Sequence, residues 1–174
     1  MATKSWLITD VSQRIHVADL AEDLAEVGAA LKGCSVTKRT LHGGLSEGVD
    51  EITVETGAGK VVLLPTRGMS IWKAWAGDLE LGWKSPNHGP VHPQYVDLGE
   101  PSGLGWLDGF DELLPRCGLE SNGAPEHDPK TNRLLYPLHG RIANRPAAKV
   151  EVTADGETGE IRVTGVVRET RFHF

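Results

Sequence analysis

The first regular pattern of apolar and polar positions lies between residues 17 and 32. Apolar side chains recur there at spacings of three and four residues, at Val17, Leu20, Leu24, Val27 and Leu31. This spacing places them on one face of an amphipathic helix. Gly33 follows as a plausible helix stop. The pattern therefore predicts a helix over residues 17–32, in an N-terminal flank that covers residues 1–34.

From residue 35 onward the pattern changes to a period of two. Short segments rich in β-branched and aromatic residues alternate with glycine-containing breaks, over residues 35–41, 49–56, 60–65, 69–75, 79–83, 148–154 and 160–174. Such segments are typical of antiparallel strands. The pair Asp155-Gly156 is a hairpin signal between the last two. We expect residues 35–174 to form a mainly β domain, an antiparallel β-sandwich.

The end of the chain continues a strand pattern, RVTGVVRETRFHF, without a closing turn. A sheet that ended there would expose an unpaired edge. We therefore expect a β-sandwich truncated at its C-terminal side. We also expect a homo-oligomer that forms through exposed sheet edges.

A long segment, residues 84–146, interrupts the strand pattern and is rich in proline and glycine. Connections of this length are uncommon in a compact domain and are usually functional when they are ordered. We expect the functional residues here.

The composition limits the class of protein. A length of 174 residues, with 39% hydrophobic and 24% charged residues, fits one globular domain. The net charge of −6 argues against nucleic acid or an anionic membrane as the main partner. No secretory signal or membrane-spanning run is evident. Cys34 and Cys117 form no recognisable framework, which favours a reducing cytoplasm.

Candidate chemistry gathers in the stretch RLLYPLHGRIANRPA, residues 133–147. His139, Arg141, Asn144 and Arg145 offer directed donors and mixed acceptors, which suit sugar hydroxyls. The alternative is a basic surface loop whose arginines form ion pairs. Arg67 follows an apolar strand and precedes a glycine, so it is either aimed into a cleft or placed at a hairpin edge.

Other side chains of the long segment leave more alternatives open. Trp83 and Trp106 can stack on sugar rings or fill the core. The carboxylates show no diagnostic spacing for acid–base catalysis; they are Asp108, Asp111, Glu112, Glu120 and Glu126. A weaker alternative is a cupin-like metalloprotein that uses His88, His92 and His127. Nucleotide-binding motifs are absent, and we expect no cofactor.

Several phrases together resemble a known family: LLPTRGMSIW, LGWKSP, GPVHP, GLGWLDGFDELLPRCGLESNGAPE and YPLHGRIAN. They are similar to an uncharacterised family of galactose-mutarotase-like proteins, often described as aldose 1-epimerase-like. The resemblance runs from about residue 15 to the last residue. It implies the N-terminal half of a large antiparallel supersandwich that binds a small-molecule carbohydrate.

The resemblance also implies roles for particular residues. An early arginine and a later His-Gly motif help to bind sugar hydroxyls in the wider superfamily, and Arg67 and His139 resemble them, with Arg141 or Arg145 as the accompanying arginine. Candidate sugar contacts are Arg67, Trp106, Glu112, Asn122, His139, Arg141 and Asn144. The catalytic histidine and glutamate of mutarotases belong to the later half, so no catalytic residue is assigned. We expect this chain to lack mutarotase activity. A non-catalytic carbohydrate-binding or sensing module is the alternative.

Overall fold

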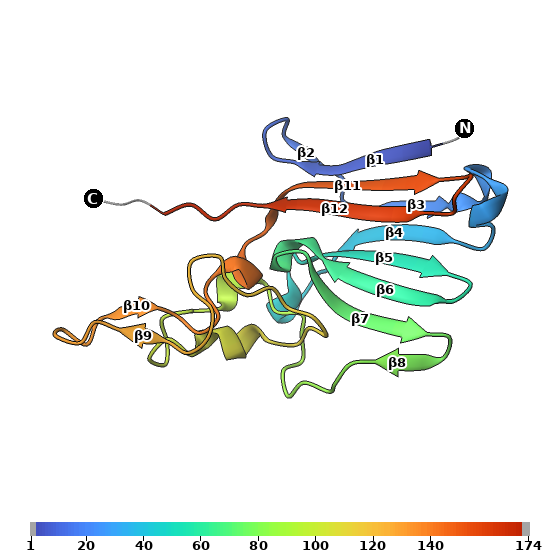
Figure 1. Ribbon diagram of the computed structural model, residues 1–174. Coiled ribbons are helices and arrows are strands. Elements are labelled where there is room, and N and C mark those ends of the chain that lie inside the picture. Colours follow the sequence, from blue (N-terminus) through green and yellow to red (C-terminus); the bar gives the residue numbers. More distant parts are fainter. Residues whose placement is uncertain (1–2, 172–174) are drawn as a thin grey trace.

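The larger of the two main sheets is a six-stranded antiparallel meander in the computed structural model, which describes residues 3–171 (Figure 1). Each strand pairs with its sequence neighbour, because short hairpins connect most of them. The strands are β3 (Leu20–Asp23), β4 (Ser35–Thr40), β5 (Asp50–Thr56), β6 (Gly59–Leu64), β7 (Ser70–Ala76) and β8 (Leu79–Leu81).

The smaller main sheet joins the two ends of the described chain. Its order is β12-β11-β1-β2, with β1 (Thr3–Asp10), β2 (Ile15–His16), β11 (Ala147–Asp155) and β12 (Ile161–Val167). β1 pairs antiparallel with β11, so that Thr3 lies opposite Asp155 and Asp10 opposite Lys149. The N-terminal strand is therefore held by a segment that lies 139 to 152 positions later in the sequence, as the pairs Asp10–Lys149 and Thr3–Asp155 show.

The hydrophobic core lies where the two main sheets face each other. Ile8, Val150 and Val152 from the smaller sheet share a buried cluster with Val36 and Ile52 from the larger sheet. Each of these side chains is at most 1% exposed. Burial of such a side chain contributes roughly 1.5–3 kcal/mol. The expected mainly β, antiparallel sandwich is confirmed.

The predicted helix over residues 17–32 is wrong. The segment forms β3, then two short 3-10 turns, η1 (Leu24–Glu26) and η2 (Ala29–Leu31). Residues 20–23 pair with residues 35–38 of β4, and this pairing satisfies backbone groups that a helix would have satisfied internally. Leu24, Val27 and Leu31 are still buried, so the apolar pattern identified core residues and misassigned their backbone.

Most strands predicted from the period of two are confirmed. The segments from residue 35 to residue 83 correspond to β4 to β8, and the two later segments correspond to β11 and β12. No strand was predicted for residues 3–10, which form β1. Residues 172–174 of the last predicted segment, including His173, lie outside the described residues.

The long segment between β8 and β11 forms a layer of loops at one end of the sheets (Figure 1). It contains short 3-10 turns and one small hairpin: η5 (Pro93–Tyr95), η6 (Gly105–Gly109), β9 (Glu126–His127), β10 (Leu134–Tyr136) and η7 (Ile142–Asn144). No helix among residues 3–171 is long and apolar enough to cross a membrane.

Candidate functional site

Arg67 lies at the centre of the loop layer, and its side chain is only 1% exposed. It ends η4 (Pro65–Arg67), the turn that follows β6. Its Nε donates to a carboxylate oxygen of Glu112, which is equally buried. Its Nη1 donates to the Val91 carbonyl at 2.8 Å and to Asn144 Oδ1 at 3.1 Å. One guanidinium thus joins three loops that are distant in the sequence.

Two glycines allow the loops to approach Arg67. Gly68 has a φ of 65° in the left-handed region, and a Cβ there would lie 2.4 Å from the Ile142 carbonyl oxygen. A Cβ at Gly109 would lie 2.9 Å from Arg67 Nη1. A larger residue at Gly68 would force the backbone apart, and one at Gly109 would displace the Arg67 side chain, because real Cβ contacts are not this short.

An aromatic group lies beside this ion pair. Trp106, in η6, is 4% exposed, and its ring centroid lies 4.7 Å from that of Phe110. The His139 ring meets Trp106 edge to face at 4.8 Å. His139 has a φ of 54°, and its backbone N–H donates to the Gly123 carbonyl at 2.9 Å. The imidazole is therefore fixed by both packing and backbone hydrogen bonds.

The same region concentrates buried polar atoms without a hydrogen-bond partner. Six of the seven such side-chain atoms in the described part of the chain belong to residues 106–144. They are Trp106 Nε1, Glu120 Oε2, Ser121 Oγ, His139 Nδ1, Arg141 Nε and Asn144 Nδ2. Buried polar groups are normally paired, so this concentration distinguishes the region from the rest of the described fold.

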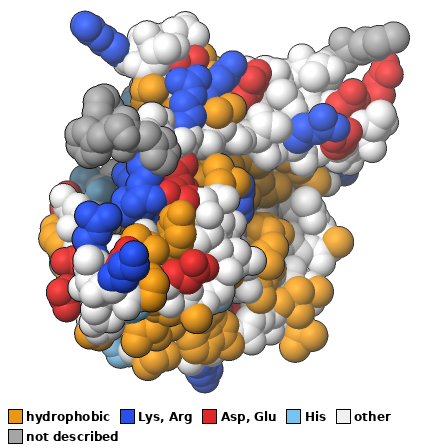
Figure 2. All heavy atoms as spheres, turned by 60° about the vertical axis from the view of Figure 1, so that its left-hand side comes forward, with side chains coloured by type: hydrophobic (Ala, Val, Ile, Leu, Met, Phe, Trp, Pro, Cys, Tyr) orange, Lys and Arg blue, Asp and Glu red, His pale blue; other side chains and the backbone are white. Residues whose placement is uncertain are grey.

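Charged side chains surround the exposed side of the loop layer, where basic and acidic groups lie side by side (Figure 2). Arg141 Nε lies 3.8 Å from Glu120 Oε2, and Arg171 pairs with the other oxygen of Glu120. Arg141 and Arg171 also line a hollow of about 270 Å³, together with Leu134 and Pro137.

The structure brings most of the predicted sugar contacts together. Arg67 is hydrogen-bonded to both Glu112 and Asn144, and Trp106 contacts His139. Arg141 lies two residues from His139 in sequence and pairs with Glu120. Asn122 is exposed, and its side chain forms no hydrogen bond or ion pair with this group among the described residues. Arg145 is half-buried, and its carbonyl accepts the Gly68 N–H at 3.0 Å.

His92 packs beside the loop between β4 and β5, where its backbone N–H donates to the Leu45 carbonyl at 2.7 Å. A Cβ on Gly48 would be 3.5 Å from the His92 ring, and His92 Nδ1 accepts the Gln94 N–H at 3.1 Å. Burial lowers the pKa of His92, the positive charge of Arg67 lowers it further, and Asp50 partly opposes both. The charges of Arg67 and Asp50 therefore both act on the pKa of His92.

Asp50 belongs to a second buried polar cluster, which joins β2, β4 and β5. Lys38, with a fully buried side chain, contacts Asp50 Oδ1 at 2.7 Å and donates to Thr40 Oγ1 at 2.8 Å. His16 Nε2 lies 2.9 Å from Asp50 Oδ2. The Asp50 backbone N–H donates to Thr66 Oγ1 at 2.8 Å, which connects this cluster to the residue before Arg67.

The weaker metal-site alternative is not supported by the placement of its ligands. His88 lies in the loop after β8, His92 precedes η5, and His127 lies in β9. Within residues 3–171, no three His, Cys, Asp or Glu side chains are grouped so that they could hold a metal ion.

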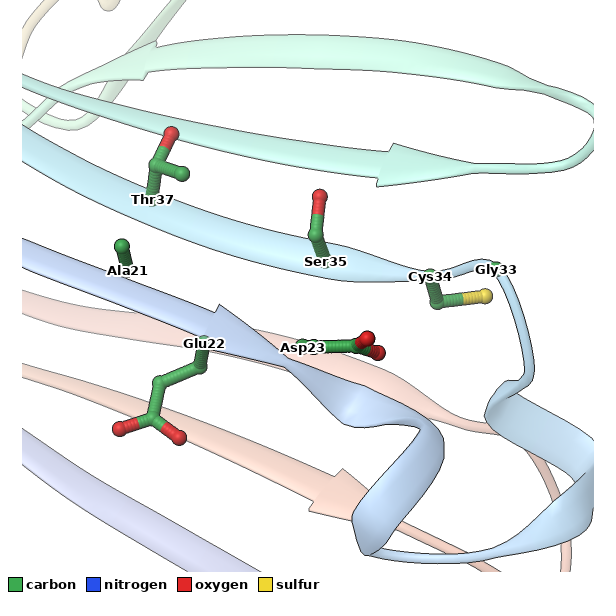
Figure 3. Close-up of a pocket in the computed structure, with 7 residues that line it drawn as sticks. All are labelled: Ala21, Glu22, Asp23, Gly33, Cys34, Ser35 and Thr37. Carbon is green, nitrogen blue, oxygen red and sulfur yellow. The ribbon is translucent and has the colours of Figure 1, made fainter.

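A hollow of about 400 Å³ is lined by residues of β3 and β4 and of the turn before β4 (Figure 3). Ser35 and Thr37 project to one side of the strands and Glu22 to the other (Figure 3). Glu22 is bound to Lys4 at 2.9 Å. None of the predicted sugar contacts lines this hollow.

Glu120 and Ser121 belong to the candidate site by their position, and the sequence did not single them out as sugar contacts. Glu120 was one of five loop carboxylates without diagnostic spacing, and Ser121 carried no signal. They reach the site because residues 118–121 pack against residues 139–142, where Gly118 donates its N–H to the His139 carbonyl and Ile142 donates to the Gly118 carbonyl. Only this tertiary contact identifies them.

Comparison with known proteins agrees with this architecture. Residues 46–174 match the family model described as "Domain of unknown function (DUF4432)". The structure is similar to a crystal structure described as a "putative aldose 1-epimerase" from Klebsiella pneumoniae subsp. pneumoniae MGH 78578. The TM-score is 0.88 and the sequence identity 34%.

The match covers 98% of this chain and 44% of the Klebsiella chain. The chain therefore spans less than half the length of the solved structure that it matches. A search of the curated proteins found no significant match. The chain belongs to the DUF4432 family and has the galactose-mutarotase-like, aldose 1-epimerase-like fold that its sequence phrases resemble.

Proposed function

We propose that this chain binds a sugar and supplies the sugar-binding part of an aldose 1-epimerase-like protein. The concentration of unpartnered buried polar atoms in residues 106–144 carries the proposal. An unpaired buried polar group costs about 1–3 kcal/mol. Sugar hydroxyls both donate and accept, so they suit a group that offers N–H donors from Trp106 and Asn144 and an acceptor oxygen from Glu120.

The proposed contacts are members of this group. His139, Arg141 and Asn144 bind hydroxyls, and Trp106 donates its indole N–H. Arg67 and Glu112 form an ion pair with each other, so we propose that they do not contact the sugar. We propose that they hold Asn144 in position through its hydrogen bond with Arg67. The predicted contact with Asn122 stays a prediction.

Mutarotation requires one group that protonates the ring oxygen and another that deprotonates the anomeric hydroxyl, and it needs no cofactor. Arginine stays protonated at neutral pH and cannot exchange protons there. We propose that this chain by itself binds sugar without accelerating mutarotation, and that epimerase activity belongs to a longer protein. A binding or sensing module without catalysis would show the same binding but no activity at any length.

Isothermal titration with a panel of aldoses tests the binding proposal. We expect His139→Ala to weaken binding tenfold or more, because it removes both the ring nitrogen and the contact with Trp106. The matched control is His42→Ala, whose side chain is 76% exposed and pairs only with Glu47 among described contacts. Equal affinity of the two variants, or no binding by the wild type, would refute the proposal.

Polarimetry with freshly dissolved aldoses tests the catalytic part. The chain is expected to leave the rate of optical rotation change at the level of buffer. A rate well above that of His139→Ala would show that His139 acts as an acid or base, and the proposed lack of catalysis would then be wrong.

A further inference from the structure

A second hollow, of about 490 Å³, opens beside β7 and β8. We call it the tryptophan hollow and define it by Trp72, Trp83, Lys73, Lys84, Asn87 and Asp111, which line it. Its volume is within the usual range of small-molecule sites. None of the seven predicted sugar contacts lines it. It is therefore separate from the group around His139.

Trp83 provides a fixed aromatic surface at this hollow. The residue is 47% exposed, which is a large apolar area to leave in water. Its indole N–H donates to the Glu112 carbonyl at 3.2 Å, and its ring centroid lies 4.8 Å from that of Phe110. Both contacts hold the ring in place. The Trp83 side chain therefore loses little conformational entropy when a ligand stacks on it.

Asp111 provides a hydrogen-bond acceptor in the same hollow. The Trp72 indole N–H donates to Asp111 Oδ2 at 2.8 Å, which fixes the carboxylate. A carboxylate can accept further hydrogen bonds through its remaining lone pairs. Burial raises the pKa of Asp111 despite the hydrogen bond from Trp72, so the carboxylate is partly withdrawn from water. Hydrogen bonds to such a group are stronger than in bulk solvent.

The charges that line the hollow balance. Lys73 and Lys84 oppose Glu80 and Asp111, and the Lys73 ammonium lies 4.6 Å from the centre of the Trp72 ring. Neither a strong anion nor a strong cation is favoured by this arrangement. A neutral ligand with one apolar face and many hydroxyls fits best.

We propose that the tryptophan hollow binds the pyranose ring of a neutral sugar, with Trp83 under the apolar face of the ring and Asp111 accepting from its hydroxyls. Asn87 adds an acceptor: its Nδ2 donates to the carbonyls of Leu107 and Phe110, which orients its amide oxygen. This site is independent of the proposed function, because it shares no sugar contact with the His139 group.

Methyl glycosides of glucose, galactose and mannose are suitable probes, because their anomeric centres cannot mutarotate. Saturation-transfer NMR and tryptophan fluorescence would follow binding to the chain. Trp83→Ala and Asp111→Asn are each expected to weaken binding at this site tenfold or more. Asp111→Asn retains an oxygen for Trp72, so it tests the site if Trp83→Ala fails to fold.

The control variant is Trp75→Ala. The Trp75 ring lies outside the tryptophan hollow and packs under the ammonium group of Lys60. Trp75→Ala is expected to leave binding unchanged. His139→Ala is expected to remove only the binding contributed by the His139 group, so that the binding weakened by Trp83→Ala remains. If no glycoside binds, or if neither Trp83→Ala nor Asp111→Asn weakens binding, the tryptophan hollow is not a sugar site. Loss of binding in His139→Ala alone would overturn this inference and leave the proposed function intact.

Discussion

Arg67 and Glu112 show how one buried pair can organise a loop layer that has little regular structure. Each residue is about 1% exposed, so neither charge is screened by water. Removal of one partner from such a pair leaves an uncompensated buried charge, which is much more costly than the loss of an exposed pair. The pair therefore makes the positions of Val91 and Asn144 depend on a single side chain.

Glu112→Gln tests this dependence. We expect it to lower the free energy of unfolding by about 3–5 kcal/mol, because the Arg67 charge stays buried without a carboxylate. Urea denaturation would measure the change. Glu160→Gln is the matched control, since the pair of Glu160 with Arg162 has both side chains more than half exposed. Equal small effects of the two substitutions would show that the Arg67 pair does not hold the layer together.

Asp50 is expected to make the free energy of unfolding depend on pH in the acidic range. Burial raises its pKa, but hydrogen bonds from Lys38, Thr40 and His16 outweigh this, and the pKa lies below its ordinary value. A lowered folded pKa means that the contribution of Asp50 to stability is present above the unfolded value of about 3.9 and is lost as pH falls through the folded value.

Asp50→Asn is therefore expected to be less stable at neutral pH and to lose less stability on acidification in that range. Denaturation at a series of pH values would measure both effects. Parallel pH profiles for the wild type and the variant would contradict the role given to Asp50.

At the scale of elements, close backbone approach decides the conformation of residues 24–31. A Cβ on Gly28 would lie 2.3 Å from the Gly156 carbonyl oxygen, in the hairpin between β11 and β12. The two 3-10 turns can pack on the smaller sheet only because both positions lack side chains. This contact spans more than 120 positions in sequence, so no local pattern reveals it.

Gly28→Ala is expected to destabilise the fold by about 1–3 kcal/mol or more, as overpacking does. Gly57→Ala is the control, because a Cβ at Gly57, in the β5–β6 turn, meets nothing within 4 Å. Thermal unfolding would compare them. If Gly28→Ala is as stable as Gly57→Ala, the backbones at Gly28 and Gly156 are not in close contact in solution.

At the scale of the whole molecule, the two main sheets end in strands with exposed apolar side chains. Leu79 and Leu81 lie on β8, the last strand of the larger sheet, and are 65% and 42% exposed. Val166 on β12, the last strand of the smaller sheet, is 45% exposed. Unpaired edges with apolar side chains can pair with another chain.

We expect the chain to self-associate as its concentration rises, and Leu79→Lys with Leu81→Lys to reduce this association. Sedimentation velocity would measure it. Val11→Lys is the control, since Val11 is 60% exposed in a turn rather than on a strand. A wild-type chain that stays monomeric at high concentration would refute the expectation.

The sequence alone determined the strands from residue 35 onward, because side chains that alternate between two faces leave a local period of two. It also indicated the candidate site, because the long loop segment and the phrase around His139 are themselves local features. Residues 17–32 show the limit of local patterns: their apolar spacing fits a helix, but pairing with β4 and contact with the β11–β12 hairpin decided their backbone.

Only the tertiary structure decided which side chains act together. Asn144 meets Arg67 across 77 positions, Glu112 meets it across 45, and Glu120 reaches Arg141 through the packing of two loops. The partners are chosen by how the loops fold over the sheet ends, and a sequence pattern records only neighbours within a few residues. For that reason the sequence named most members of the candidate site, whereas the ion pair at its centre, the role of Glu120 beside Arg141 and the tryptophan hollow required the fold.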